Sequence, residues 1–405
     1  MAVTAAALYA TPNALAPFYR RFRVADRLLL TGHSHQAWPD VAFDAQQRAW
    51  FDAAEKVDDK WEWAFKQAER VRRGFARLLD DPGGMIALGT NTHEMVIRFL
   101  SALPLKQRPR LVTTDGEFHT IRRQLDRLAE EGIEVVKVPA DPATAIAERL
   151  VAAVNDRTSA VLVSSVLYSN AHIVPGLGQV LEACRRVGAE LLVDAYHALN
   201  VVPFSLGEQR LEGAFVVGGG YKYCQLGEGN AFLRFPSDCT LRPVSTGWFS
   251  EFAELAGSSE GGRVRYGPGP ARFAGATYDP ASHYRASAVF DFFDEEGLTP
   301  SLLREVSQHQ VGLLAQLFDD LGLDPNVVDR DRSVTLDRVG GFLALQTPRA
   351  AELCTRLREK RVLTDWRGDS LRLGPAPYLS DEQLRETMRF VGDIARSPGR
   401  RSAAT

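Results

Sequence analysis

A regular alternation of short apolar runs with amphipathic segments, between residues 85 and 220, constrains the fold of this chain most strongly. The runs at 161–163 and 191–193 are apolar at every position, which is typical of strands buried on both faces of a parallel sheet. Segments such as 176–188 repeat their apolar residues at three- to four-residue spacing, which indicates helices. We therefore predict an α/β fold, doubly wound around a mostly parallel sheet.

The rest of the chain divides around this alternating region. Helical patterns precede it, and two further helical patterns and a smaller α+β set follow it. We predict an amino-terminal segment at 1–60 that completes the functional site, a large ligand-binding domain at 61–280, a small carboxyl-terminal domain at 281–396 and a flexible tail at 397–405.

Composition and charge narrow the class of partner. The 405 residues are 45% apolar and 24% charged, an ordinary balance for a globular protein, and 48 Lys and Arg against 51 Asp and Glu give a net charge of −3. We expect no nucleic-acid or membrane partner, because the chain has no cationic excess and no apolar run approaching the roughly 20 residues of a membrane span. The four separated cysteines predict neither a disulfide framework nor a metal site, and favour the cytoplasm. A small-molecule ligand is the remaining expectation.

Two charged residues directly follow predicted buried strands. Asp194 ends the run 190–194, where open α/β sheets bind ligands, and a carboxylate there needs a cationic partner. Lys222 follows the glycines at 218–220, which allow close approach of a ligand, and burial there would lower the pKa of its amine and make it nucleophilic. Alternatively, Asp194 caps a helix and Lys222 lies on the surface.

An acid that pairs with a pyridinium nitrogen and a lysine that forms a Schiff base are the two protein groups that pyridoxal phosphate requires. Asp194-x-x-His197, followed by a glycine-rich turn into Tyr-Lys-Tyr at 221–223, resembles the class V aminotransferase group of fold-type I enzymes, and within it the kynureninases. The resemblance extends from 31–34 to 371–375. It implies pyridoxal phosphate as the cofactor and a large domain with a mostly parallel seven-stranded sheet beside a smaller α+β domain.

The resemblance assigns roles to individual residues. Lys222 would form the Schiff base and Asp194 would keep the pyridine nitrogen protonated, so these two are the predicted catalytic residues. The other implied cofactor contacts are Thr92, His93, Phe118, Ser164, His197, Tyr221, Trp248 and Thr277. Alternatively, Phe118 is a core aromatic, and Asn91 and Thr92 only cap a helix.

The implied positions of Trp248 and Thr277 concern a second subunit. Gly-Trp-Phe at 247–249 matches a kynureninase motif whose Trp reaches the cofactor phosphate of the partner subunit, and Thr277 matches a phosphate-binding position used across a dimer interface. A homodimer with shared active sites is therefore implied.

Three residues are the expected substrate contacts. Arg372 is the candidate for the substrate α-carboxylate, because its planar fork can donate two parallel hydrogen bonds. His33 and Tyr168 are the other two, although His33 is equally a loop histidine and Tyr168 a packed aromatic. The glycine-rich segment 261–270 is either a lid or, as we favour, a surface loop.

The resemblance implies an enzyme of amino-acid metabolism, most directly hydrolytic Cβ–Cγ cleavage of the kynureninase type in tryptophan catabolism, with alanine and an aryl acid as products. The linker near 60–63 lacks the longer loop that holds the aryl ketone in kynureninases, and Thr277 replaces their usual Asn. An aminotransferase, an epimerase or another lyase therefore stays open as an alternative, and a non-catalytic binding module is more remote. Cysteine desulfurisation is disfavoured because the segment 363–367 contains no Cys.

Overall fold

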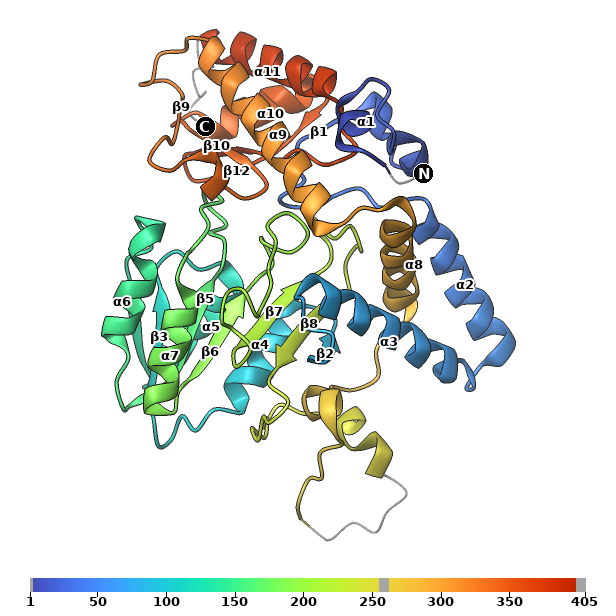
Figure 1. Cartoon of the computed structure of the whole chain (residues 1–405), viewed down its shortest axis with the longest axis vertical. Coiled ribbons are helices and arrows are strands. Elements are labelled where there is room, and N and C mark those ends of the chain that lie inside the picture. The colour runs from blue at the N-terminus through green and yellow to red at the C-terminus, as the bar shows by residue number, and fades with distance from the viewer. Residues whose placement is uncertain (1–2, 255–261, 398–405) are drawn as a thin grey trace, which may run out of the picture.

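The computed structural model describes residues 3–254 and 262–397 (Figure 1). All but the first residue of the predicted tail at 397–405 lies outside the described residues, as does Gly261 of the predicted surface loop. Figure 1 shows a central sheet covered by helices, with a smaller unit of helices and short strands above it that contains the carboxyl-terminal part of the chain. The predicted domain boundaries stay a prediction.

The central sheet has seven strands in the order β2-β8-β7-β6-β5-β3-β4. β8 runs antiparallel to its two neighbours, β2 and β7, and all other pairs in this sheet are parallel, so the predicted fold class, a doubly wound and mostly parallel sheet, is confirmed. The strands are β2 (Met85–Gly89), β3 (Arg110–Thr114), β4 (Glu134–Val138), β5 (Thr158–Ser164), β6 (Glu190–Asp194), β7 (Phe215–Gly219) and β8 (Ala231–Phe235).

Alternate residues of the strands belong to two separate apolar cores, one on each face of the sheet. On β5, Val161 and Val163 belong to one core, and Ala160 and Leu162 to the other. Every residue of β5 is buried, which explains the continuous apolar run in the sequence. The helices that connect these strands are α4 (Thr92–Ser101), α5 (His119–Glu130), α6 (Ile146–Ala153) and α7 (Leu177–Val187).

The carboxyl ends of the parallel strands meet at one edge of the sheet, and this edge positions the site. Ser164 ends β5, Asp194 ends β6, and Lys222 lies three residues after β7. Because β5, β6 and β7 are neighbours in the sheet, their following residues are brought together.

Short strands bring segments from the two ends of the chain together. The amino-terminal β1 (Leu28–Leu29) pairs in parallel with β11 (Val362–Leu363). A second sheet has the order β12-β13-β10-β9 and is antiparallel throughout. Its strands are β9 (Asp329–Arg330), β10 (Leu343–Gln346), β12 (Asp365–Arg367) and β13 (Ser370–Leu373).

The remaining helices complete the description. The α-helices are α1 (Ala5–Tyr9), α2 (Val41–Lys56), α3 (Lys60–Leu78), α8 (Ala281–Glu296), α9 (Pro300–Asp320), α10 (Ala350–Glu359) and α11 (Asp381–Arg396). The 3-10 helices are η1 (Ala16–Tyr19), η2 (Val24–Asp26), η3 (Ala143–Ala145), η4 (Trp248–Glu254), η5 (Gly269–Phe273) and η6 (Leu336–Arg338). None of the described helices is long and apolar enough to cross a membrane.

The packing of α3 against α8 predicts opposite effects of two Gly→Ala substitutions. A Cβ at Gly74 in α3 would lie 2.3 Å from Cδ2 of Phe290 in α8, whereas a Cβ at Gly312 in α9 meets no heavy atom within 4 Å. Gly74→Ala should therefore destabilise the protein by about 1–3 kcal/mol through overpacking. Gly312→Ala should stabilise it by about 0.5–1 kcal/mol through helix propensity. Thermal unfolding measures both, and a rise in Tm for Gly74→Ala would contradict this packing.

Candidate active site

A cavity of about 170 Å³ lies at the carboxyl edge of the central sheet. Its lining gathers side chains from the ends of five strands or the loops after them, as an open α/β sheet requires. The lining residues are Asn91, Thr92, His93, Phe118, Thr120, Ser164, Val166, Tyr168, Asp194, Tyr196, His197, Tyr221 and Lys222. Most of the cofactor contacts predicted from the sequence are therefore brought together, with Tyr168 beside them.

The Lys222 amine is the buried cation of this cavity. Its Nζ lies 2.5 Å from Nε2 of His197, 4.9 Å from the ring centroid of Tyr196 and 5.3 Å from that of Phe118. Desolvation lowers the pKa of Lys222 to about 7, and the negative charge of Asp194 opposes this shift. A substantial fraction of the amine is therefore neutral near pH 7, as a nucleophile requires.

Asp194 and His197 define the electrostatics around this amine. Oδ1 of Asp194 accepts a hydrogen bond from the backbone N–H of Tyr196 at 2.9 Å. Burial raises the pKa of Asp194, and Lys222 opposes that shift. Burial also lowers the pKa of His197 well below its usual value, so its ring is neutral, and its buried Nδ1 has no hydrogen-bond partner. The alternative in which Asp194 is only a helix cap and Lys222 a surface residue does not describe this arrangement.

Thr92 and its neighbours form the start of α4 beside the cavity. The Asn91 side chain caps the helix by accepting a hydrogen bond from the Glu94 N–H at 2.9 Å. The Thr92 hydroxyl is buried with no partner, although Thr92 lines the cavity. An unpaired hydroxyl at a helix N-terminus, near a buried lysine, fits the phosphate of an anionic cofactor. The capping interpretation and the phosphate interpretation therefore apply to different residues, Asn91 and Thr92.

Glu117 is a site residue whose role the sequence analysis missed. Its Oε1 accepts hydrogen bonds from the Thr114 hydroxyl at 2.7 Å and the Ser164 N–H at 3.2 Å, and its Oε2 lies 2.6 Å from the Ser164 hydroxyl. Burial raises the pKa of Glu117 to about 7, and nearby Asp194 adds to the shift. Glu117 therefore fixes the Ser164 hydroxyl at the cavity wall. Its position just beyond a buried strand was the signal, the same one that identified Asp194.

The predicted substrate contacts Arg372 and His33 lie together, and an acidic residue that was not foreseen joins them. Arg372 forms a bidentate pair with Asp365, from Nε to Oδ1 at 2.9 Å and from Nη2 to Oδ2 at 2.5 Å. His33 is completely buried, with its Nε2 2.7 Å from Oδ1 of the same carboxylate. Desolvation lowers the pKa of His33 to about 4, so it is a neutral partner. Neither Arg372 nor His33 lines the 170 Å³ cavity.

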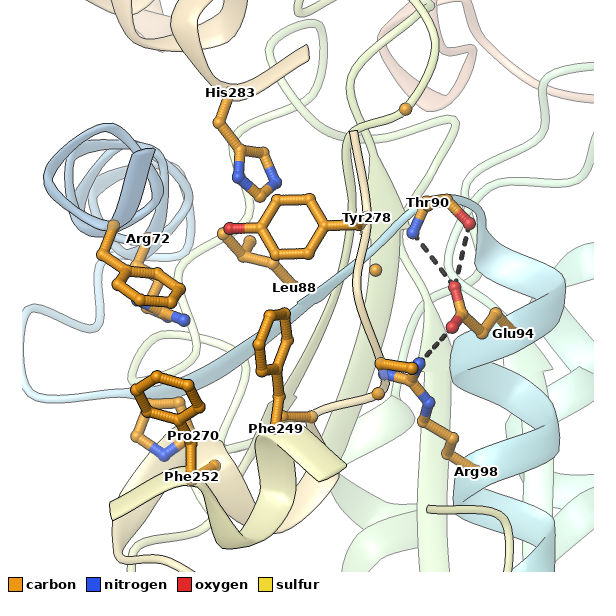
Figure 2. A pocket seen from close by; sticks show the side chains of 17 residues that line it. Arg72, Leu88, Thr90, Glu94, Arg98, Phe249, Phe252, Pro270, Tyr278 and His283 are labelled. Carbon is orange, nitrogen blue, oxygen red and sulfur yellow. Dashed lines mark hydrogen bonds and ion pairs between the residues drawn. The ribbon is translucent and has the colours of Figure 1, made fainter. Parts of the chain in front are cut away.

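Trp248 and Thr277 lie elsewhere, beside a second cavity of about 270 Å³. The indole N–H of Trp248 donates a hydrogen bond to the Thr277 hydroxyl at 3.2 Å, and the Trp248 side chain is exposed. Figure 2 shows the neighbouring residues Phe249 and Tyr278 facing the second cavity, with Glu94 between Thr90 and Arg98 on its other side. Neither Trp248 nor Thr277 lines the 170 Å³ cavity that contains Lys222, so their predicted cofactor contacts stay a prediction.

Comparison with curated proteins reveals distant relatives across most of the chain, although no family model matches it. An uncharacterised aminotransferase, YcbU, of Bacillus subtilis is 22% identical, covering 84% of this chain and 87% of the relative. The isopenicillin N epimerase of Streptomyces clavuligerus is 27% identical, covering 78% and 81%. A kynureninase of Bacillus cereus is 23% identical, covering 75% and 72%.

Solved structures with the same fold cover nearly the whole chain. The cystine C–S lyase C-DES, in complex with its product cysteine persulfide, superimposes with a TM-score of 0.78 at 18% identity, covering 91% of this chain and 98% of its own. A cysteine desulfurase of Thermococcus onnurineus NA1 gives a TM-score of 0.76 at 14% identity, covering 92% and 95%. The fold is therefore that of the fold-type I pyridoxal-phosphate-dependent enzymes. Together, the fold and the sequence relatives support a class V aminotransferase-like enzyme that uses pyridoxal phosphate.

The charges around Lys222 predict opposite effects of two substitutions on its pKa. Asp194→Asn removes a negative charge that favours the ammonium form, so the pKa of Lys222 should fall. Arg372→Gln removes a positive charge that disfavours it, so the pKa should rise. Labelling of Lys222 in cofactor-free protein with an amine-reactive reagent, followed across pH by peptide mass spectrometry, measures both. Shifts of the same sign in the two variants would contradict this electrostatic balance.

The buried Glu117 carboxyl predicts a pH-dependent contribution to stability. The folded protein keeps a proton on Glu117 up to about pH 7, whereas the unfolded chain loses it near the ordinary value of 4.5. The free energy of unfolding should therefore fall as pH rises through this window, by up to about 3 kcal/mol from this group. Glu117→Gln stays neutral and should lack this contribution. The Tm of wild type minus that of the variant should decrease between about pH 4.5 and 7, and a constant difference would refute the buried-acid interpretation.

Proposed function

We propose that this enzyme acts on an L-amino acid, with kynureninase-type hydrolytic cleavage of the Cβ–Cγ bond as its leading reaction and alanine and an aryl acid as products. The observation that carries the proposal is the buried Lys222 amine, with its pKa lowered to about 7, in one cavity with Asp194 and the start of α4. A kynureninase is among the relatives that match over most of the chain.

The cavity contains a suitable group for each part of pyridoxal phosphate. Lys222 would hold the cofactor covalently and Asp194 would pair with its ring nitrogen. Phe118, whose ring lies 5.3 Å from Nζ of Lys222, would stack on the ring face. The Thr92 hydroxyl and the first amides of α4 would bind the phosphate. The bound cofactor would supply an electron sink for the charge that develops when a bond to the substrate Cα is broken.

Lys222 is our candidate for the base that transfers the proton at the substrate Cα. With substrate bound and its amine not engaged, the Nζ of Lys222 would remove this proton and return it. A pKa of about 7 suits both directions, because a base that operates near its own pKa accepts and releases protons with similar ease. His197, 2.5 Å from Nζ, positions the amine, and burial of the site excludes water from it.

The reactions that remain open differ in how the enzyme must hold the side chain of the substrate. Tyr168 lines the cavity and packs edge-on against Phe118, with ring centroids 5.3 Å apart, so it is our candidate contact for the side chain. Epimerisation is the second candidate, because isopenicillin N epimerase is 27% identical. The predicted short linker at 60–63 is the first turn of α3, so the connection between α2 and α3 is residues 57–59 and has no room for the longer ketone-binding loop that the resemblance to kynureninases implies.

We further propose that two copies of the chain share their active sites. Trp248 and Thr277 contact each other but lie outside the cavity of their own chain. Trp248 is 45% exposed and packs against Phe252, which is 46% exposed, with their ring centroids 5.3 Å apart. A second copy would cover this surface and receive both residues at its cofactor phosphate.

The free thiol form of all four cysteines accords with a cytoplasmic enzyme.

The proposal predicts which products Lys222 makes possible. Purified enzyme should release alanine from L-kynurenine, and Lys222→Ala should lower kcat by at least about 10²-fold because the variant loses both the cofactor anchor and the base. Lys360→Ala, an exposed lysine far along the chain, is the matched control and should retain full activity.

Measuring alanine release, exchange of the substrate Cα proton in D₂O and keto-acid-dependent amine transfer in parallel separates the candidates. Exchange with neither alanine release nor amine transfer would replace the kynureninase-type reaction by epimerisation, and keto-acid-dependent amine transfer would replace it by transamination. A wild-type enzyme that exchanges no Cα proton with any amino acid would contradict the proposed function.

A further inference from the structure

The guanidinium of Arg372 already holds a carboxylate, and that carboxylate belongs to the chain itself. Asp365 on β12 and Arg372 on β13 are directly opposite in the antiparallel register, so their side chains share one face of the small sheet. Nε and Nη2 of Arg372 donate to the two oxygens of Asp365 at 2.9 and 2.5 Å. This is the geometry in which an arginine binds a free carboxylate ligand.

Little of Arg372 remains available for a ligand while this pair is intact. Its Nη1 donates to the backbone carbonyl of Tyr168 at 2.8 Å, and only 5% of the side chain is exposed. Asp365 is also shielded, with 19% of its side chain exposed, so the two charges compensate each other largely out of water. A ligand carboxylate that approaches Arg372 therefore meets a neutral pair.

The pair lies next to the candidate active site. Tyr168, whose carbonyl receives the Arg372 hydrogen bond, lines the cavity that contains Lys222. Both Arg372 and Asp365 are close enough to Lys222 to shift the pKa of its amine. A substrate bound at Lys222 thus has its own carboxylate within reach of this pair.

Asp365 has two other partners that can retain it if Arg372 is taken. His33 contacts its Oδ1 at 2.7 Å from a completely buried position. Nη2 of Arg367 lies 3.8 Å from Oδ2, two residues further along the same strand and on the same face. The Arg367 side chain is half exposed, so it can move toward Asp365 without breaking a buried contact.

We propose that Asp365 is a specificity-determining residue that occupies Arg372 in the resting enzyme and gives it up only to a ligand carboxylate. In the bound state the ligand carboxylate takes the Nε–Nη2 edge of Arg372, and Asp365 stays on His33 and shifts to Arg367. One carboxylate replaces another, so the local charge on Arg372 stays balanced. A ligand without a carboxylate cannot make this exchange and leaves the Asp365–Arg372 pair closed.

This inference deepens the proposed function and rests on it, because it concerns the same substrate site. It predicts that Asp365 competes with the substrate carboxylate. A residue that merely orients Arg372 would instead support carboxylate binding. The two roles therefore predict changes of opposite sign when Asp365 loses its charge.

The test is calorimetric titration of the holoenzyme with propionate and, as a matched ligand without charge, propionamide. Asp365→Asn should bind propionate at least about tenfold more tightly than wild type, because a charge-assisted pair no longer has to be exchanged. Its affinity for propionamide should not change. The double variant Asp365→Asn with Arg372→Gln should lose the gain, which shows that the gain acts through Arg372.

A second variant tests the exchange without altering the pair. Arg367→Ala removes the group that receives Asp365, so it should weaken propionate binding several-fold in the wild-type background and have no effect beside Asp365→Asn. Propionate affinity that falls or stays constant in Asp365→Asn would overturn the inference, and so would unchanged affinity in Arg367→Ala should the first variant fail to fold. Because these titrations need no turnover, their failure in an active enzyme overturns this inference alone. Loss of all amino-acid chemistry with the predicted titrations intact would overturn only the proposed function.

Discussion

The site depends on keeping one amine, that of Lys222, out of water at the carboxyl edge of the sheet. Burial of an ammonium is costly, and the chain offsets this cost with Asp194 and with the ring faces of Tyr196 and Phe118. Neither compensation is local in sequence. The neighbouring positions of β6 and β7 in the sheet bring Asp194 beside Lys222. The strand order is therefore what makes a reactive lysine tolerable in this fold.

The ionisable groups around that amine either form pairs of opposite charge or are kept neutral by burial. Lys222 faces Asp194, and Arg372 faces Asp365. A third acid, Glu117, lies close to Asp194. Its pKa is raised to about 7, so its carboxyl is protonated and neutral over most of the range below pH 7. His33 and His197 are neutral through burial. A cavity with so little net charge suits an anionic cofactor and a zwitterionic substrate, each of which then meets only a few placed donors.

Charge pairing also affects the candidate substrate contact on β13, Arg372. The resemblance to kynureninases assigns recognition of the substrate carboxylate to Arg372, but here Arg372 is held by a carboxylate from the neighbouring strand. Residues 57–59 form only a short connection between α2 and α3. An aminotransferase, an epimerase and a kynureninase match at similar identity, so the comparisons leave the reaction open.

Sequence reasoning succeeded where strand ends decide the outcome and failed where pairing does. Apolar runs placed Asp194 and Lys222 at the ends of buried strands, and the cavity contains both. Glu117 satisfied the same rule, because it lies just beyond the buried β3, but it was not among the predicted site residues. Asp365 required the hairpin register, for which Gly368 and Asp369 between two short strands were the available signal. The predicted roles of Trp248 and Thr277 stay predictions, because neither residue lines the cavity that contains Lys222.

The most direct test of the account is to reduce the purified holoenzyme with borohydride and map the modified peptide by mass spectrometry. We expect a single phosphopyridoxyl group on Lys222, the lysine whose burial makes its amine nucleophilic. A phosphopyridoxyl group on any other lysine, or none at all in protein saturated with pyridoxal phosphate, would contradict it.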